Sequence, residues 1–361
     1  MSEAIHAQNA THAFHRRGAC PASPLAISRR CRRGLAAIGV VAGVALARSG
    51  GGASPIGTGA VVIDTTVGYQ GGSAAGTGMV LTSSGEVLTN NHVIQGATSI
   101  RIVVPGTDHE YTAKVAGYDV ADDVAVLQAT GASNLKTISM AASSTVAVGD
   151  VVTAVGNADG TGKLASATGS ITGVQQSIVV SNDPAGTESL IGLIETDAGL
   201  QPGDSGGPLF NSAGKVIGMD TAASTGYTFR STATDGYAIP IANALSIANQ
   251  IDSGHASTSV HVGSTAFLGI EVQPSGAPGG LGVSSPGALV AGVVPGEPAA
   301  SAGLSAGDVI TAIDGHAIGS SSSITSVLLT KKPGSKVEIT YTNQSGASQS
   351  VSVTLAGGPA Q

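Results

Sequence analysis

A serine surrounded by glycines occupies the segment GDSGGP at 203–208. A serine hydroxyl is a weak nucleophile until a base removes its proton, and acyl transfer also requires backbone N–H groups facing the developing oxyanion. Glycine permits the sharp bend that lets the N–H groups of Gly203 and Ser205 converge, and it lets a substrate backbone approach closely. The alternative is an ordinary glycine-rich turn. The segment predicts Ser205 as a nucleophile, with an oxyanion hole formed by Gly203 and Ser205.

The base that activates such a serine is expected to be a histidine. The chain has eight histidines, three of which lie in the basic N-terminal segment. His255 and His261 lie in a polar stretch, His316 lies in the second unit, and His109 is interpreted as a solvated loop residue. His92 lies where a strand-like run ends in a turn, which places its imidazole at a rim rather than in a core. His92 is therefore the predicted base.

A carboxylate is needed to hold the histidine tautomer and to stabilise the imidazolium. Three nearby candidates are Asp119, Asp122 and Asp123. Asp123 immediately precedes the apolar run 124–127, so it can be buried at the start of a strand. Asp119 and Asp122 are expected to face solvent. We therefore predict that Asp123 orients His92.

The distribution of charge excludes several functions. Among 361 residues, 42% are hydrophobic and 11% are charged, against about 25% charged in a typical soluble domain. Residues 48–361 contain 10 basic and 22 acidic residues, a formal net charge of −12, and so lack the basic surface of a nucleic-acid binder. Both cysteines, Cys20 and Cys31, lie before residue 48. Disulfides, thiolate metal sites and thiol catalysis are therefore excluded from the body of the chain.

The N-terminal segment 1–47 is typical of an export signal. Four arginines within 29–33 precede an apolar run at 35–47, which ends in Ala-Leu-Ala. Those 13 residues are fewer than the roughly 20 that span a bilayer as a helix, and the pattern fits a secretory signal peptide. A membrane anchor at 34–47 is the alternative. The glycine-rich stretch 48–59 is expected to be a flexible linker.

The body of the chain is expected to be mainly β. From 60 to 252, short β-rich runs alternate with Gly, Asn and Ser, and helix-length patterns between them are missing. One helix is predicted at 241–251 from its apolar spacing. A linker at 253–263 precedes a second β-rich unit at 264–357, which carries a short helix at 323–329. The sequence therefore predicts two domains.

The order His92, Asp123, Ser205 resembles that of chymotrypsin-like proteases. The phrases TNNHVI, DDVAVL, ETDAGLQPGDSGGPL, GKVIGMDTA and GYAIPI are similar to the HtrA/DegP branch, notably its secreted actinobacterial members. The resemblance implies a chymotrypsin-like double β-barrel of two six-stranded barrels, with the triad between them and no metal or organic cofactor. Most members have Asn before the serine, whereas this chain has Asp204, whose role stays open.

The substrate pocket is expected to be small and apolar. Trypsin-like cleavage needs a carboxylate six residues before the serine, where this chain has Gly199. A buried Lys or Arg side chain would lack a partner there. Leu200, Thr221 and Ala222 are predicted to complete an S1 pocket for Val, Ala or similar P1 residues.

The second unit resembles a PDZ domain, a small α+β fold. Residues Phe267, Leu268, Gly269 and Ile270 look like its carboxylate-binding loop, and the segments 296–304 and 307–310 match the middle of the family's domain. Backbone N–H groups of such a loop bind a C-terminal carboxylate, and the peptide adds as a strand to the sheet. An ordinary small β domain with the same turns is the alternative.

These observations predict an exported serine endopeptidase that cleaves unfolded or damaged proteins and binds their C-termini. Its partners are polypeptides, not nucleic acids. The resemblance implies a homo-oligomer such as a trimer, although 48–68 lacks aromatic side chains that would mark an interface. The alternative is a chaperone-like binding protein in which proteolysis is secondary.

Overall fold

The structure is a computed structural model that describes residues 57–69, 71–107, 109–141, 146–182, 186–221, 236–273 and 287–360. The predicted export segment, most of the linker at 48–59, and Ala222 lie outside the described residues. None of the helices within the described ranges is long and apolar enough to cross a bilayer.

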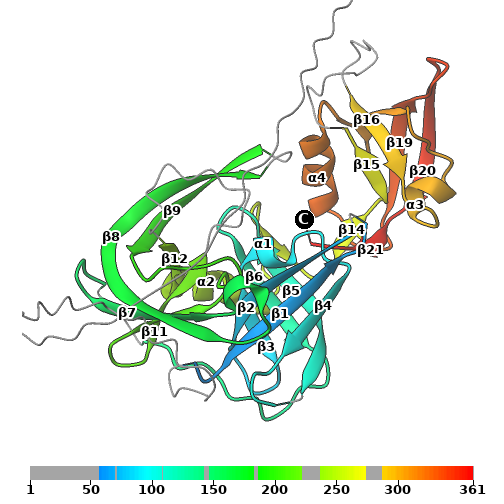
Figure 1. Cartoon of the computed structure of the whole chain (residues 1–361). Helices are drawn as coiled ribbons and strands as arrows, with labels where there is room; N and C mark the ends of the chain where they lie inside the picture. The colour runs from blue at the N-terminus through cyan, green and yellow to red at the C-terminus, as the bar shows by residue number, and fades with distance from the viewer. Residues whose placement is uncertain are drawn as a thin grey trace, which may run out of the picture. The chain divides into compact units, whose positions relative to one another are not determined.

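The strands between residues 60 and 129 form a closed sheet (Figure 1). Seven strands follow the order β13-β5-β4-β1-β2-β3-β6, and an additional β5–β6 pairing closes six of them into a barrel. Alternate residues of each strand face opposite sides, so Val87 and Leu127 fill the barrel while Leu88 and Val126 point to a second core. The six barrel strands are β1 (Ala60–Val67), β2 (Gly72–Val80), β3 (Glu86–Thr89), β4 (Ser99–Val103), β5 (Glu110–Asp119) and β6 (Val124–Ala129).

A second barrel follows, closed in the order β10-β11-β12-β9-β8-β7. Its interior is filled by side chains that include Val152, Ile171, Ile194 and Leu209. The arrangement of two six-stranded barrels confirms the expected fold. The strands are β7 (Val151–Gly156), β8 (Ala165–Asn182), β9 (Gly186–Thr196), β10 (Pro208–Asn211), β11 (Val216–Thr221) and β12 (Gly236–Pro240).

A shared hydrophobic core joins the two barrels. Leu88 and Val126 of the first barrel belong to one buried cluster with Phe210 and Met219 of the second. Helix α2 (Ile241–Asp252) closes this cluster with the apolar face that its sequence predicts. Residues from distant parts of the chain therefore come together where the two barrels pack against each other.

The stretch 253–263, expected to be an unstructured linker, contains a short strand. β13 (Val260–Val262) pairs with Gly117–Asp119 of β5, and His261 is buried there with its ring against that of Tyr118. Gly117 permits the close approach, since a Cβ at this position would lie 2.5 Å from the His261 carbonyl oxygen. A three-residue strand is too short to produce a periodic pattern in the sequence.

Residues after β13 form the small second domain, with its own core around Ile310, Ile324 and Ile339. Its main sheet follows the order β15-β16-β17-β19-β20, with β18 paired to β17, while β14 pairs with β21. Helix α4 starts where the Ser320 hydroxyl accepts a hydrogen bond from the Ser323 N–H. The elements are β14 (Thr265–Phe267), β15 (Ile270–Val272), β16 (Ala288–Val293), α3 (Pro298–Ser301), β17 (Val309–Ile313), β18 (His316–Ala317), α4 (Ser321–Leu329), β19 (Lys336–Thr342), β20 (Ser348–Thr354) and β21 (Ala356–Gly358).

Candidate active site

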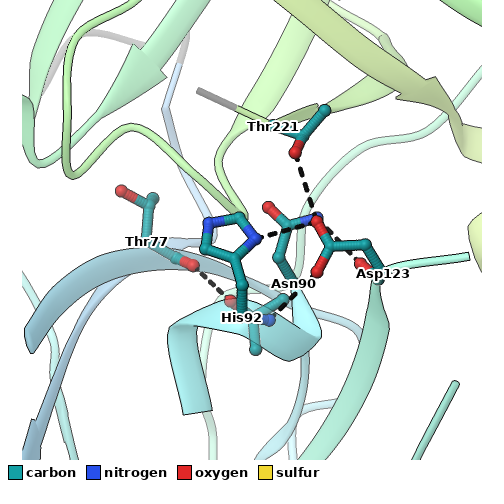
Figure 2. A network of polar contacts seen from close by, with 6 residues as sticks. Thr77, Asn90, His92, Asp123 and Thr221 are labelled. Carbon is teal, nitrogen blue, oxygen red and sulfur yellow. Dashed lines mark hydrogen bonds and ion pairs between the residues drawn. The ribbon is translucent and has the colours of Figure 1, made fainter. Parts of the chain in front are cut away.

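His92 lies on α1 (Asn91–Ile94), a single helical turn that follows β3. The sequence predicts only a turn here. Nδ1 of His92 lies 2.8 Å from Oδ2 of Asp123, and the backbone N–H of His92 donates to Oδ1 of the same carboxylate at 3.0 Å (Figure 2). A carboxylate on Nδ1 keeps the proton on that nitrogen and leaves Nε2 as the basic atom.

Asp123 is held from several sides. The Asn90 amide donates to its backbone carbonyl at 2.9 Å, and the Thr221 hydroxyl donates to Oδ2 at 3.2 Å (Figure 2). Asp123 is 6% exposed and has φ +53°, a conformation that Asp tolerates better than most residues. The Asp123 carboxylate therefore accepts three hydrogen bonds, two from His92 and one from Thr221.

The two other aspartates considered for this role differ from expectation in one respect. Asp122 is exposed, as predicted. Asp119, expected to face solvent, is only 1% exposed, because it ends β5 inside the ladder with β6 and β13. Its carboxylate accepts the Asp122 backbone N–H at 3.1 Å, so it stabilises the turn that precedes Asp123.

The loop carrying Ser205 needs glycine on both sides of the serine. Gly203 has φ +96° and Gly206 has φ +82°, conformations that residues with a Cβ rarely adopt. A Cβ at Gly206 would also lie 2.2 Å from the Thr77 carbonyl oxygen. Ser205 itself is 4% exposed, and its carbonyl accepts a hydrogen bond from the Thr77 N–H at 2.9 Å.

Backbone hydrogen bonds tie this loop to the strand that contacts Asp123. The Gly206 N–H donates to the Asp220 carbonyl, and the Asp220 N–H donates to the Gly207 carbonyl, each at 2.8 Å. The next residue on β11 is Thr221, which contacts the Asp123 carboxylate. The serine loop, the histidine turn and the aspartate therefore meet at one place, although they come from distant parts of the sequence.

Two further buried carboxyl groups belong to the serine loop and to the adjacent strand β11. Burial raises the pKa of Asp204 to about 6, with Asp159 adding to the rise and the Gln201 N–H opposing it. Burial raises the pKa of Asp220 well above its usual value, and the neighbouring Asp204 adds to this. Neither oxygen of the Asp220 carboxyl has a hydrogen-bond partner within the described part of the chain. Sequence reasoning missed Asp220, although an acid inside the apolar strand 216–221 was a usable signal.

The predicted pocket residues are only partly described. Gly199 is exposed, with φ +68° and no atom of the described residues within 4 Å of a Cβ placed there. Leu200 is half-buried against Gly236. Thr221 is buried and bonded to Asp123, whereas Ala222 lies outside the described residues.

The predicted carboxylate-binding loop of the second domain lies between β14 and β15. Phe267 ends β14 and Ile270 begins β15. Between them, Leu268 is buried and Gly269 has φ +77°. The Leu268 and Gly269 carbonyls accept hydrogen bonds from outside the loop at 2.9 Å each. The loop therefore has fixed peptide orientations, which a backbone anion site requires.

Within the described ranges, no three His, Cys, Asp or Glu side chains are grouped so that they could hold a metal ion.

Comparison with known proteins gives two family matches and many relatives. Residues 76–219 match the trypsin-like peptidase domain, and residues 266–355 match the PDZ domain. The chain is 33% identical over 290 residues to a probable periplasmic serine endoprotease DegP-like of Halomonas elongata, covering 79% of this chain and 56% of the relative. It is 36% identical over 289 residues to the periplasmic pH-dependent serine endoprotease DegQ of Escherichia coli K12, covering 78% and 59%.

A solved structure, the HtrA-type protease AlgW with tripeptide, is similar with 29% identity and a TM-score of 0.46, over 83% of this chain and 94% of that one. The chain spans less than two thirds of the length of the two curated relatives. The resemblance to the HtrA/DegP branch is confirmed, while the narrower actinobacterial subtype stays a prediction. The chain therefore carries a trypsin-like peptidase domain followed by a PDZ domain, and its homologues are serine endoproteases of the HtrA/DegP type.

Proposed function

We propose that the chain is an exported serine endopeptidase whose catalytic triad is His92, Asp123 and Ser205. The observation that carries the proposal is the hydrogen bond between Asp123 and His92 Nδ1. Strand β11 links this pair to the glycine-flanked serine loop, since Thr221 of β11 contacts Asp123 and Asp220 of β11 is bonded to the loop backbone. The homology to serine endoproteases supports it. The protease domain is assigned to 60–252 and the PDZ domain to 264–357.

The reaction follows from the roles of the three side chains. The Ser205 hydroxyl attacks the scissile carbonyl while His92 Nε2 takes its proton, and the imidazolium then protonates the leaving amine. Asp123 holds the proton of His92 on Nδ1 and stabilises the imidazolium that forms. The N–H groups of Gly203 and Ser205 stabilise the oxyanion of the tetrahedral intermediate. Water, activated by His92, then releases the acyl group.

Substrates are unfolded or damaged polypeptides, cleaved after small aliphatic residues. Gly199 supports this preference, since it offers no carboxylate to a basic P1 side chain. The PDZ domain captures C-termini at the loop 267–270. Two relatives named as periplasmic support export. The N-terminal segment is assigned as a signal peptide or an anchor, and the active protein as a homo-oligomer.

Hydrolysis of unfolded casein tests the proposal. Wild-type protein should degrade casein, Ser205→Ala should be inactive, and Ser84→Ala, at an exposed serine in the β2–β3 turn, should match the wild type. Activity retained in Ser205→Ala would refute the triad. Faster cleavage of peptides with P1 Arg than with P1 Val would refute the pocket assignment.

A chaperone-like role is the competing hypothesis, and the same variants distinguish it from proteolysis. If holding is the main role, Ser205→Ala should suppress the aggregation of a denatured substrate as well as the wild type does, and the wild type should show negligible turnover.

A further inference from the structure

Thr77 on β2 connects the first barrel to the serine loop of the second. Its side chain is fully buried. The hydroxyl donates to the Gly203 carbonyl at 2.7 Å and accepts a hydrogen bond from the Asn157 N–H at 2.9 Å. Its own backbone N–H donates to the Ser205 carbonyl at 2.9 Å. One residue thus contacts the backbone on both sides of Asp204 and also a separate turn.

Both peptide groups that flank Gly203 are held in place. The carbonyl of the preceding peptide, at Pro202, accepts the Asp159 N–H at 2.7 Å. The following peptide is held at both ends, since its carbonyl accepts from Thr77 and its N–H, from Asp204, donates to the Gln201 carbonyl at 3.0 Å. The direction of the Gly203 N–H is therefore fixed. No described residue accepts a hydrogen bond from it, which leaves it available to an oxyanion.

The turn that holds Pro202 depends on the same hydroxyl. Asn157 and Asp159 belong to one tight turn around the 3₁₀ segment η1 (Ala158–Gly160). This turn is anchored by the bond from the Asn157 N–H to Thr77 and by the bond from the Gly162 N–H to the Asn157 side chain at 2.7 Å. Loss of the Thr77 hydroxyl would release the Gly203 carbonyl directly and would weaken the Pro202 contact indirectly.

Thr77 is itself rigidly placed. It pairs with Val62 in the β1–β2 ladder, and its carbonyl accepts the Thr89 hydroxyl at 2.7 Å. We propose that Thr77 is a positioning residue for the oxyanion hole: its hydroxyl holds the Gly203–Asp204 peptide directly, through the Gly203 carbonyl, and it supports the Pro202–Gly203 peptide, which carries the Gly203 N–H, through the turn at Asn157. The inference rests on the proposed function of Ser205 and extends it to a residue on the other barrel.

A matched pair of variants tests this role. Thr77→Val keeps the shape of the side chain but leaves the Gly203 carbonyl and the Asn157 N–H buried without a partner, which is costly, while Thr77→Ser keeps the hydroxyl. The control is Thr65→Val, which removes another buried hydroxyl of the same barrel, one that donates to the Ala74 carbonyl at 3.2 Å.

The readouts are kcat and KM on a soluble peptide substrate, and inhibition by a peptide boronate, whose adduct places an oxygen in the oxyanion hole. Because removal of one oxyanion donor costs roughly 100- to 1,000-fold in kcat, a misdirected donor in Thr77→Val should cost roughly 10- to 100-fold. KM should be nearly unchanged, and boronate affinity should fall in parallel with kcat. Thr77→Ser and Thr65→Val should retain kcat close to that of the wild type.

A wild-type kcat in Thr77→Val would overturn the inference, as would an equal loss in Thr65→Val. If Thr77→Val does not fold, the smaller Thr77→Ala takes its place with the same expected outcomes. The Ser205→Ala variant distinguishes a failure of the proposed function from a failure of the role assigned to Thr77. If it still hydrolyses peptides, the proposed function fails. If it is inactive while Thr77→Val is fully active, only the role of Thr77 fails.

Discussion

Asp123 engages His92 twice, through Nδ1 at 2.8 Å and through the backbone N–H at 3.0 Å. The second contact fixes the position of the whole turn α1, so the carboxylate orients both the ring and the segment that carries it.

Asp123→Asn should therefore lower kcat by about 10⁴-fold. The amide can donate to His92 Nδ1, which moves the imidazole proton to Nε2 and removes the base. Peptide hydrolysis at pH 8 measures the effect, with Asp122→Asn, at an exposed position, as the control expected to match the wild type. A loss below tenfold in Asp123→Asn would contradict the role of this carboxylate.

Gly206→Ala should destabilise the serine loop strongly. The new Cβ would lie 2.2 Å from the Thr77 carbonyl oxygen and 2.3 Å from the Thr89 hydroxyl, in a backbone with φ +82°. The control is Gly214→Ala, where φ is +68° but no atom in the described part of the chain lies within 4 Å of the added Cβ, so it carries backbone strain of only about 1 kcal/mol. The Tm and the rate of reaction with a fluorophosphonate should both be lower in Gly206→Ala than in the wild type. An equal loss of Tm in the two variants would contradict the predicted crowding at Gly206.

Asp204→Asn should raise stability at alkaline pH. The pKa of Asp204 is raised to about 6 in the folded chain, so folding favours the protonated form, and the stability contributed by this group is lost as pH rises from about 4 through about 6. Between pH 5 and pH 8, the wild type should lose about 1 kcal/mol through this group. Asparagine should remove that loss while still accepting the Gln201 N–H. The measurement is the difference in Tm between variant and wild type, which should be larger at pH 8 than at pH 5. A difference independent of pH would contradict the raised pKa.

Glu86→Gln should also stabilise the chain above neutral pH. Partial burial, followed by the charge of Asp252, raises the pKa of Glu86 to about 7. Asp252 lies at the C-terminal end of α2, where the helix dipole disfavours a negative charge. The protonated form of Glu86 is thus favoured in the folded state, and its stabilisation is lost as pH rises from about 4.5 through about 7. Tm measured at pH 5.5 and pH 8.5 should show a gain for Glu86→Gln only at the higher value. A gain in Tm of the same size at pH 5.5 would contradict the raised pKa of Glu86.

Much of this organisation could be predicted from the sequence because its signals are local. Glycines beside Ser205, the strand end before His92 and the apolar run after Asp123 each occupy a few consecutive residues. The apolar spacing of 241–251 predicts α2 in the same way. The resemblance of five short segments to the HtrA/DegP branch then implied the two-barrel fold.

The remaining features depend on contacts between distant residues. Thr77 resembles any strand threonine, and its partner Gly203 lies 126 positions away. Asp119 is buried by pairing with β6 and β13, which no local pattern reveals. The short β13 and the turn α1 are stabilised by the barrel on which they pack rather than by their own sequence.

The most direct test of the central claim is covalent labelling with a fluorophosphonate, mapped by peptide mass spectrometry. The account predicts one label per active chain, on Ser205, with none on Ser205→Ala and with labelling of His92→Ala slowed by orders of magnitude. A label on another serine, or equal labelling rates in His92→Ala and the wild type, would contradict it.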